Sequence, residues 1–296
     1  MATPVPAHPV PAGPLAVRWL AHELPVLRAG TRDSWVLLEF ENAGSAAWDA
    51  HGQEGIWLSY HWLDPLGNPI VWGTRYVALP WPVPPGKRVS VSFPIEPPIP
   101  PGRYRLAFDL VDEGRAWFAD LGNARLEQDV EVQPRLRTRA LAVRLGDGPS
   151  ELVRLTKAAL AGQEEPVVDG GDAVAHLMPG CRPAADWSRR VLDVHDEGYA
   201  AVAGSIEVEG SWLERRRSAD ELRPWRPGFG RSPGWDLSLL CPSVVADLAD
   251  DVSWAPAVCG MPALDPSSLR EPWLCDGRIR IVVPVRALRP AGRRSG

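Results

Sequence analysis

The stretch GDAVAHLMPGCRPAADWSRRVL, residues 171–192, decides how the second half of this chain is expected to fold. Asp172 to Met178 is a short apolar run that ends at a Pro-Gly break, which predicts a buried strand running into a turn. A helix should follow, because Pro183 suits a first helical position. The apolar residues that repeat at helical spacing behind it are Trp187, Val191 and Val194.

The next stretch, DVHDEGYAAVAGSIEV at residues 193–208, continues the same unit. Gly198 is expected to end the helix, and Tyr199 to Val208 returns as a second apolar strand. The unit is therefore predicted to be strand, helix, strand, with a right-handed crossover and parallel pairing of the two strands.

This order resembles the middle of a family 2 glycosyltransferase of the GT-A type, which reads strand, Asp-x-Asp, Pro-x-x-Trp helix, Gly-Gly strand. In that family the two aspartates hold a divalent metal on the diphosphate of a nucleotide sugar. Here Met178 and Gly180 occupy those places. A thioether and a hydrogen cannot replace oxygen ligands for Mg²⁺ or Mn²⁺. The resemblance thus implies a small α/β domain like part of a GT-A fold, with a degenerate metal motif and a shortened nucleotide-binding half.

Composition limits the partners of the chain. Its 296 residues are enough for two domains, and a net charge of −5 gives no general electrostatic case for nucleic acid. No apolar run reaches the length of a membrane span, and the N-terminus lacks the pattern of a secretion signal. We therefore expect a cytoplasmic protein with no nucleic-acid partner, no cofactor and no metal.

The cysteines are Cys181, Cys241, Cys259 and Cys275. They form no C-x-x-C pair and have no histidine at ligand spacing. We interpret them as reduced, mostly buried thiols rather than as a disulfide or zinc site.

Residues 1–14 are proline-rich and are expected to be a mobile or extended tail. From residue 15 to 134 the chain changes to short apolar runs between Gly/Pro turns. Seven runs at this spacing predict an antiparallel β-sandwich. They are residues 16–24, 34–44, 55–64, 69–79, 88–96, 102–114 and 124–132.

This half also resembles the tryptophan-rich, immunoglobulin-like domain of the autophagy receptor next to BRCA1, and related bacterial modules that accompany sugar-modifying enzymes. The matching features are the Asn42-Ala43-Gly44 turn leading to Trp48, the Pro85-Gly86 turn, and the turn that leads into Tyr104. The resemblance implies an Ig-like β-sandwich and leaves the ligand open.

Eight tryptophans fall in this domain, and Trp35, in an alternating strand, is most simply a core residue. Other rings near strand ends or loops are candidates to stack on sugars or to anchor a protein partner. These candidates are Tyr60, Trp62, Trp72, Trp81 and Trp117. The alternative is that they pack under the long connections and against the second domain.

Two polar features lie near these rings. His61 alternates with Tyr60 and Trp62, so we interpret it as a surface or interface histidine on the opposite face. The acidic side chains at a later strand end have no regular ligand spacing and are expected in a solvated turn. They are Asp109, Asp112 and Glu113.

The domain boundary is placed in QPRLRTR at residues 133–139, which gives a second domain over 135–288 and a flexible tail over 289–296. The loop PWRPGFGRSPGWD carries Arg226 and Arg231, which are candidates to bind a phosphate or carboxylate if they converge. Residues 254–277 are expected to be loop-like, and 278–285 a final strand at a sheet edge because Pro284 lacks a donor.

No catalytic constellation stands out. Four titratable residues near the helix end do not share one face and are expected to face solvent. They are Asp193, His195, Asp196 and Glu197. His176, in the apolar strand, is interpreted as a hydrogen-bonded core histidine, and no catalytic residue is assigned.

The sequence is therefore interpreted as a two-domain protein with a non-catalytic role in a sugar-modification or biosynthetic pathway. Its partner would be a glycan or an enzyme, with the second domain a pseudo-glycosyltransferase. The alternatives are an active glycosyltransferase without the metal motif, and a protein-protein adaptor. The sequence leaves the sugar, the oligomeric state and the domain arrangement open.

Overall fold

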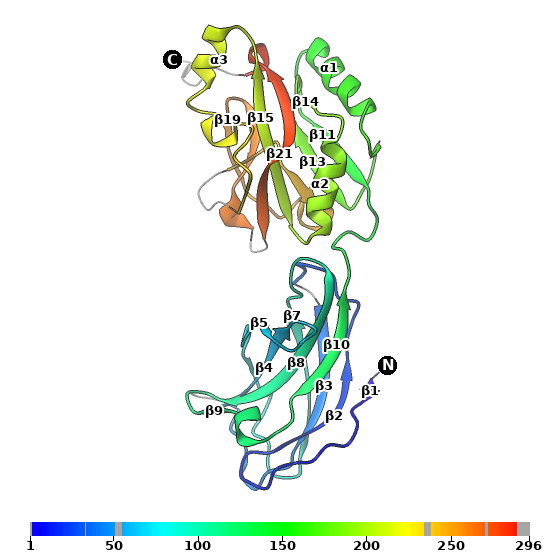
Figure 1. The fold of residues 1–296 in the computed structure, drawn as a ribbon, viewed down its shortest axis with the longest axis vertical. Helices are drawn as coiled ribbons and strands as arrows, with labels where there is room; N and C mark the ends of the chain where they lie inside the picture. Colours follow the sequence, from blue (N-terminus) through cyan, green and yellow to red (C-terminus); the bar gives the residue numbers. More distant parts are fainter. Residues whose placement is uncertain (1, 33, 51–54, 234–237, 270–271, 289–296) are drawn as a thin grey trace. The chain divides into compact units, whose positions relative to one another are not determined.

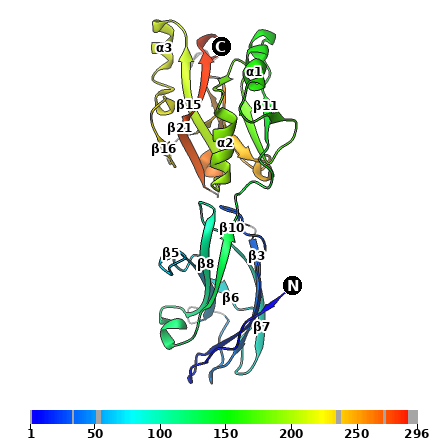
Figure 2. The same cartoon turned by 45° about the vertical axis from the view of Figure 1, so that its right-hand side comes forward.

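The computed structural model describes residues 2–32, 34–50, 55–233, 238–269 and 272–288. The chain forms two compact units, residues 1–133 and 134–296, each of which Figures 1 and 2 draw from two sides. The tail expected at 289–296 lies outside the described residues. Among the described helices, none has the length and apolar character needed to cross a membrane.

Unit 1 consists of two antiparallel sheets. The first has the order β1-β2-β3-β7, and the second has the order β10-β8-β4-β5, with β6 paired to β4 and β9 to β8. The first sheet contains β1 (Thr3–Pro4), β2 (Val17–Glu23), β3 (Ser34–Asn42) and β7 (Arg88–Ile95). The second contains β4 (Ile56–Leu63), β5 (Pro69–Val71), β6 (Val77–Ala78), β8 (Gly102–Asp112), β9 (Ala116–Trp117) and β10 (Leu126–Val132), with the short 3₁₀ helix η1 (Ala119–Leu121).

Two segments of unit 1 differ from the simplest interpretation of the sequence. The proline-rich start of the chain is extended, and its β1 pairs with β2. The run at residues 69–79 is divided into β5 and β6, because Gly73 between them has a positive φ of 63° that a continuous strand does not accept. The division places a loop across β4, to which both short strands pair.

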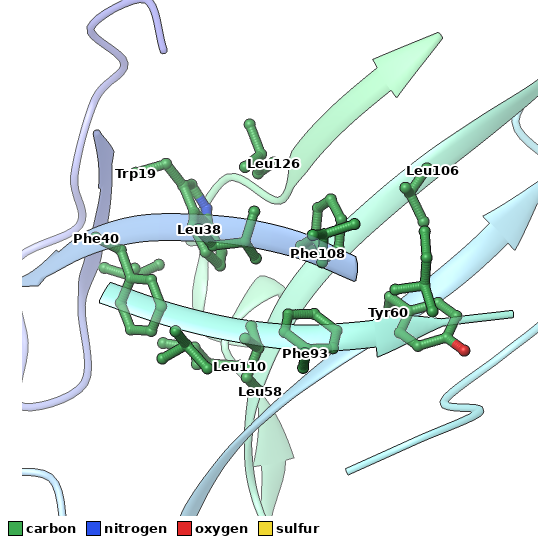
Figure 3. Packing of buried hydrophobic residues seen from close by; sticks show 14 of the residues in the cluster. Trp19, Leu38, Phe40, Leu58, Tyr60, Phe93, Leu106, Phe108, Leu110 and Leu126 are labelled. Carbon is green, nitrogen blue, oxygen red and sulfur yellow. The ribbon is translucent and has the colours of Figure 1, made fainter. Parts of the chain in front are cut away.

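One hydrophobic core lies between the two sheets (Figure 3). In β3 the side chains of Val36, Leu38 and Phe40 are fully buried, whereas Trp35 is 56% exposed. The prediction that Trp35 belongs to the core is wrong. Successive strand residues point to opposite faces, and the three aliphatic and aromatic residues of the other phase occupy the core.

Unit 2 combines an eight-stranded mixed sheet with three α-helices and a separate three-stranded sheet. The large sheet contains β11 (Leu141–Leu145), β12 (Val167–Val168), β13 (Ala173–Leu177), β14 (Arg182–Pro183), β15 (Ala201–Glu209), β16 (Arg231–Ser232), β18 (Ser243–Val245) and β21 (Trp273–Pro284). The small sheet contains β17 (Leu239–Leu240), β19 (Trp254–Val258) and β20 (Met261–Leu264). The helices are α1 (Ser150–Ala161), α2 (Trp187–Asp196) and α3 (Trp212–Ser218), with 3₁₀ turns η2 (Arg223–Trp225), η3 (Ala246–Leu248), η4 (Pro266–Ser268) and η5 (Val285–Ala287).

The central strand, helix, strand unit is present as β13, α2 and β15, but its strands do not pair. β18 lies between them and is antiparallel to both. The predicted parallel pairing is therefore wrong, because a segment from much later in the chain takes the place beside β13. β15 pairs in parallel with β21 instead.

The helix of this unit starts later than expected. Pro183 belongs to β14, and α2 begins after Asp186. Its predicted apolar face is confirmed, because Trp187, Val191 and Val194 are each at most 2% exposed, and α2 packs against β15 and β21 (Figure 1).

Two further expectations for unit 2 are wrong. The segment expected to be loop-like supplies β19, β20 and the first half of β21. β21 is not an edge strand, because it pairs with β15 along one side and with β14 and β16 along the other. Pro284 is tolerated because it is the last residue of the strand.

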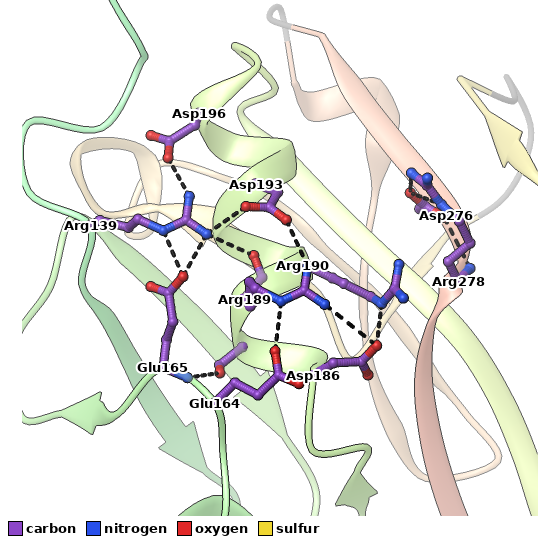
Figure 4. Close-up of polar contacts among 11 residues, drawn as sticks. Arg139, Glu164, Glu165, Asp186, Arg189, Arg190, Asp193, Asp196, Asp276 and Arg278 are labelled. Carbon is purple, nitrogen blue, oxygen red and sulfur yellow. Dashed lines mark hydrogen bonds and ion pairs between the residues drawn. The ribbon is translucent and has the colours of Figure 1, made fainter.

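Charged residues around α2 form an ion-pair network rather than facing solvent alone (Figure 4). Arg139 contacts the carboxylates of Glu165, Asp193 and Asp196 at 2.6, 2.5 and 2.5 Å. Arg189 contacts Asp193 from the same helix at 3.3 Å. The network joins α2 to the segments before β11 and β12, which gives the acidic residues near the helix end a structural role.

The adjacent glycines 170 and 171 test how closely the segment before β13 packs on the segment before β11. A Cβ on Gly171 would lie 2.4 Å from the Ala140 carbonyl oxygen, whereas a Cβ on Gly170 would meet no atom within 4 Å. We expect Gly171→Ala to lower the free energy of unfolding by about 1–3 kcal/mol, the usual cost of overpacking. Gly170→Ala is the control and should have almost no effect in the same urea titration. Equal effects of the two substitutions would contradict the close approach of Gly171 to Ala140.

Candidate functional site

The outer face of the second sheet of unit 1 is buried and polar. Ser59, His61 and Asp109 alternate with core residues of β4 and β8, so they point away from the core. Ser59 is directly opposite Asp109 in the strand pairing. All three side chains are at most 1% exposed. His61 lies on the face opposite Tyr60 and Trp62, as expected, but it is buried rather than at the surface. The expected solvated acidic turn is wrong, because Asp109 and Asp112 are buried and Glu113 alone of the three is exposed.

His61 is fixed by a loop that crosses this face. The Gly73 amide donates to His61 Nδ1 at 3.0 Å, and the Trp72 ring stacks on the imidazole at a centroid distance of 3.8 Å and an angle of 14°. Burial, together with the nearby charge of Arg125, lowers the pKa of His61 to about 4. The ring is thus neutral at pH 7, and since Nδ1 accepts, its proton is on Nε2.

Four side chains surround His61 in what we call the aromatic cluster, composed of Trp72, Tyr76, Trp117 and Arg125. Trp117 lies 6.0 Å from Trp72 and 6.1 Å from Tyr76 between ring centroids. The Arg125 guanidinium lies 5.4 Å from the centroid of the Trp72 ring. Trp72 and Tyr76 remain 46% and 47% exposed, so the cluster covers the polar face and also presents aromatic surface.

Glycine is needed in the loop that carries this cluster. Gly73 has a φ of 63°, and a Cβ there would lie 3.1 Å from Tyr76 Oη and 3.4 Å from the Trp117 ring. A larger residue would push the rings apart. The β5–β6 connection is therefore shaped to bring Trp72 and Tyr76 onto β4 and β9.

Three successive outward positions of β4 carry a buried polar atom without a hydrogen-bond partner among the described residues. They are Trp57 Nε1, Ser59 Oγ and His61 Nε2. Unpaired buried polar atoms cost free energy and are rare in native structures. A row of them beneath one exposed cluster distinguishes this face from the rest of unit 1.

Asp109 lies in the same row. Its carboxylate accepts hydrogen bonds from the Leu110 amide at 2.8 Å and the Ala119 amide at 3.4 Å. Burial nevertheless raises its pKa to about 7, the amides and Arg125 working in the other direction and Asp120 adding to the rise. The group therefore titrates near neutral pH beneath the aromatic cluster.

The structure separates the predicted site residues. Trp72 and Trp117 are brought together, whereas Tyr60 and Trp62 are buried in the core. Tyr60 Oη accepts from the Glu96 amide and Trp62 Nε1 donates to the Glu96 carbonyl, so neither ring can meet a ligand.

Trp81 is 51% exposed, and within the described part of the chain its ring makes no contact with the rings of the aromatic cluster. Sequence reasoning did not select Tyr76 or Arg125, because their neighbours on β4 and β9 are distant in the chain. The alternation of His61 with two aromatic residues was the one local signal of a second buried face.

In unit 2, Arg226 and Arg231 do not share a partner. Arg231 pairs with Glu197 at 2.5 Å and with Asp276 at 3.5 Å. Arg226 donates to the Ala219 carbonyl at 2.9 Å. Arg231 is thus part of the structural charge network, and Arg226 remains available to a ligand.

Met178 and Gly180, the positions compared with the metal-binding aspartates, are constrained by the residues packed around them. Met178 is 8% exposed within the core, and Gly180 has a φ of 98° with a Cβ position 2.9 Å from the Ala287 Cβ. An aspartate at position 180 would be strained. In the part of the chain that the structure describes, no group of three His, Cys, Asp or Glu side chains is arranged to hold a metal.

A serine-histidine pair in unit 2 has no access to substrate. His195 Nδ1 donates to the Tyr199 carbonyl at 2.8 Å, and Nε2 accepts from Ser243 Oγ at 2.9 Å. His195 is fully buried and Ser243 is 1% exposed. The pair joins α2 to β18, which corrects the expectation that His195 faces solvent.

His176 and the cysteines are also accounted for. His176 lines a cavity of about 360 Å³ at the ends of β11 and β13. Burial lowers the pKa of His176 to about 4, and its Nε2 has no partner among the described residues, so it is not the hydrogen-bonded core histidine expected. The four cysteines are free thiols, three of them buried, and the Sγ atoms of Cys181 and Cys241 are 3.9 Å apart.

No protein-family model matches the chain, and no curated protein matches it. Among solved structures, the C-terminal domain of wzt is similar at 10% identity and a TM-score of 0.28, over 44% of this chain and 78% of that domain. A beta-glucosidase from Listeria innocua in complex with glucose is similar at 14% identity and a TM-score of 0.24, over 39% of this chain and 15% of the glucosidase.

A family 123 glycoside hydrolase from Clostridium perfringens is similar at 11% identity and a TM-score of 0.23, over 64% of this chain and 34% of the hydrolase. The resemblance to carbohydrate-related domains is distant, and scores this low carry no argument about function. None of the three is a GT-A glycosyltransferase or the receptor domain, so they add no support to either resemblance drawn from the sequence.

The buried carboxyl of Asp109 predicts a pH dependence. Its folded pKa of about 7 is above the ordinary value of 3.8, so the stability that this group contributes is present at low pH and is lost as the pH rises through 7. Asp109→Asn should therefore stabilise the protein at pH 8 by up to about 4 kcal/mol, three pKa units at about 1.4 kcal/mol each.

This advantage should disappear below pH 4, as measured by urea titrations of both proteins across the pH range. The contribution of His61 to stability changes with pH in the opposite direction, because its lowered pKa removes stability on acidification. Both proteins contain His61, so this contribution cancels when their free energies of unfolding are subtracted. A difference that does not change with pH would contradict the assignment.

Proposed function

We propose that unit 1 binds a glycan at the aromatic cluster, and that the protein is a non-catalytic binding or scaffolding component of a sugar-modifying pathway. The observation that supports this most is the gathering of Trp72, Tyr76 and Trp117 beside a charged pair. Arg125 lies next to Trp72 and contacts Glu127 at 3.4 Å.

The chemistry of this arrangement suits a sugar. A pyranose has faces of C–H bonds and a rim of hydroxyl groups, whereas an indole offers a flat apolar face with polar groups at its edge. The exposed rings would pack on the C–H face. The guanidinium of Arg125 donates to hydroxyl oxygens, and the carboxylate of Glu127 accepts from hydroxyl groups.

The buried polar side chains beneath the aromatic cluster do not touch the sugar; they hold an exposed ring in place. His61 supports one face of Trp72 through the 3.8 Å stack and is itself fixed by the Gly73 amide. A ring that is already immobilised loses less conformational entropy when a ligand binds. The neutral state of His61 also keeps a second positive charge away from Arg125.

Two other functions are compatible with the sequence. An adaptor would use the same exposed rings to contact a protein, since aromatic residues and arginine are frequent at interfaces. An active glycosyltransferase without the metal motif is the alternative suggested by the resemblance of unit 2; the strain at Gly180 bears only on an aspartate at that position.

The experiment is a glycan array probed with the full chain, followed by titration of the sugars retained. We expect Trp72→Ala to weaken binding by about thirtyfold, as loss of an anchoring aromatic residue costs about 2 kcal/mol. Trp35→Ala is the matched control, because Trp35 is 56% exposed, slightly more than Trp72 at 46%, but lies on the first sheet. It should bind as the wild type does.

Thermal melting of each variant separates a lost contact from a lost fold. Binding that survives Trp72→Ala, or that falls equally in Trp35→Ala, would rule out the aromatic cluster as the site. An array without any retained sugar, together with co-purification of one protein that depends on Trp72, would favour the adaptor instead.

A further inference from the structure

A groove of about 390 Å³ in unit 2 is lined by three arginines. It lies between β15, which contributes Ile206 to Val208, and α3 with the chain that follows it as far as Pro227. The charged and aromatic side chains that line it are Trp212, Arg215, Arg216, Arg226 and Glu207. This volume falls within the range of small-molecule sites.

Helix geometry explains why these side chains converge. Trp212, Arg215, Arg216 and Ala219 are spaced i, i+3, i+4 and i+7, so they share one side of α3. The start of the helix is fixed by a capping box in which the Glu214 carboxylate accepts from the Ser211 amide at 2.8 Å. Arg217 lies on the same helix but does not line the groove.

The charge in the groove is not neutralised by its neighbours. Glu207, the lining carboxylate, pairs with Arg280 at 2.6 Å. The Arg216 guanidinium lies 5.2 Å from the Trp212 ring centroid, and Arg226 donates to the Ala219 carbonyl. Within the described residues, Arg215, Arg216 and Arg226 form no ion pair with a carboxylate.

Several other arginines of unit 2 are paired with carboxylates. Arg139, Arg189, Arg231 and Arg278 each contact at least one carboxylate within 3.5 Å. Among the described residues, the groove is therefore lined by three guanidinium groups that pair with no carboxylate, in a chain with a net charge of −5. An anion in the groove is attracted by all three positive charges.

We propose that this groove binds a small phosphate-bearing ligand. The planar guanidinium fork matches two phosphate oxygens at once, and three such groups suit a ligand that carries more than one negative charge. Arg226 is held in place by its backbone contact, which leaves its other N–H groups for the ligand. Trp212, 61% exposed, supplies a ring at the same groove.

Isothermal titration of the full chain with pyrophosphate at constant ionic strength tests this inference. We expect saturable binding, and we expect Arg215→Ala and Arg226→Ala each to weaken it about tenfold, the usual effect of losing a charged hydrogen bond. Arg217→Ala removes the same charge from the same helix outside the groove and should change the dissociation constant by less than about twofold.

Titration with ATP and with a sugar phosphate separates the possible sources of the phosphate. Equal affinity for ATP and pyrophosphate supports recognition of phosphate alone. Tighter binding of ATP that Trp212→Ala abolishes supports a nucleotide whose base stacks on the ring. The absence of saturable binding to all three, or an equal loss in Arg217→Ala, overturns the proposal. Because the groove is in unit 2, none of these outcomes tests glycan binding by unit 1.

Discussion

The stack of Trp72 on His61 is the contact on which the proposed site of unit 1 depends. β4 is buried on both faces, so the outward side chains of Ser59 and His61 require a cover. The β5–β6 loop provides it through a hydrogen bond from Gly73 and a ring stack at 3.8 Å. The same contact that protects the buried imidazole presents the exposed part of Trp72, so the cover and the binding surface are one structure.

Unit 2 depends on a different constraint, the position of β18. This short strand separates β13 from β15 and is antiparallel to both, while Ser243 within it bonds to the fully buried His195 of α2. The hydrogen bond between His195 and Ser243 thereby fixes α2 to β18, the strand that separates β13 from β15. The neutral imidazole is maintained by burial, which lowers its pKa to about 4.

Arginine has two roles in unit 2. Around α2 it connects segments through short ion pairs, as Arg139 does with three carboxylates. Beside α3, Arg215 and Arg226 line one groove and, within the part of the chain that the structure describes, pair with no carboxylate. An arginine is always charged, so its role depends on which acceptors the fold places near it. The two groups of arginines therefore differ in their surroundings and not in their chemistry.

The sequence by itself determined most strands of unit 1 and the apolar face of α2, because alternation and helical spacing are properties of neighbouring residues. It did not determine which phase of β3 enters the core, and so Trp35 was misplaced. Nor did it determine which face of β4 enters the core, so Tyr60 and Trp62 were selected. It did not show that a loop covers the other face, so Tyr76 and Arg125 were missed. Only the tertiary structure decided these points, because burial, the order of strands and the pairing of charges depend on contacts between residues far apart in the chain.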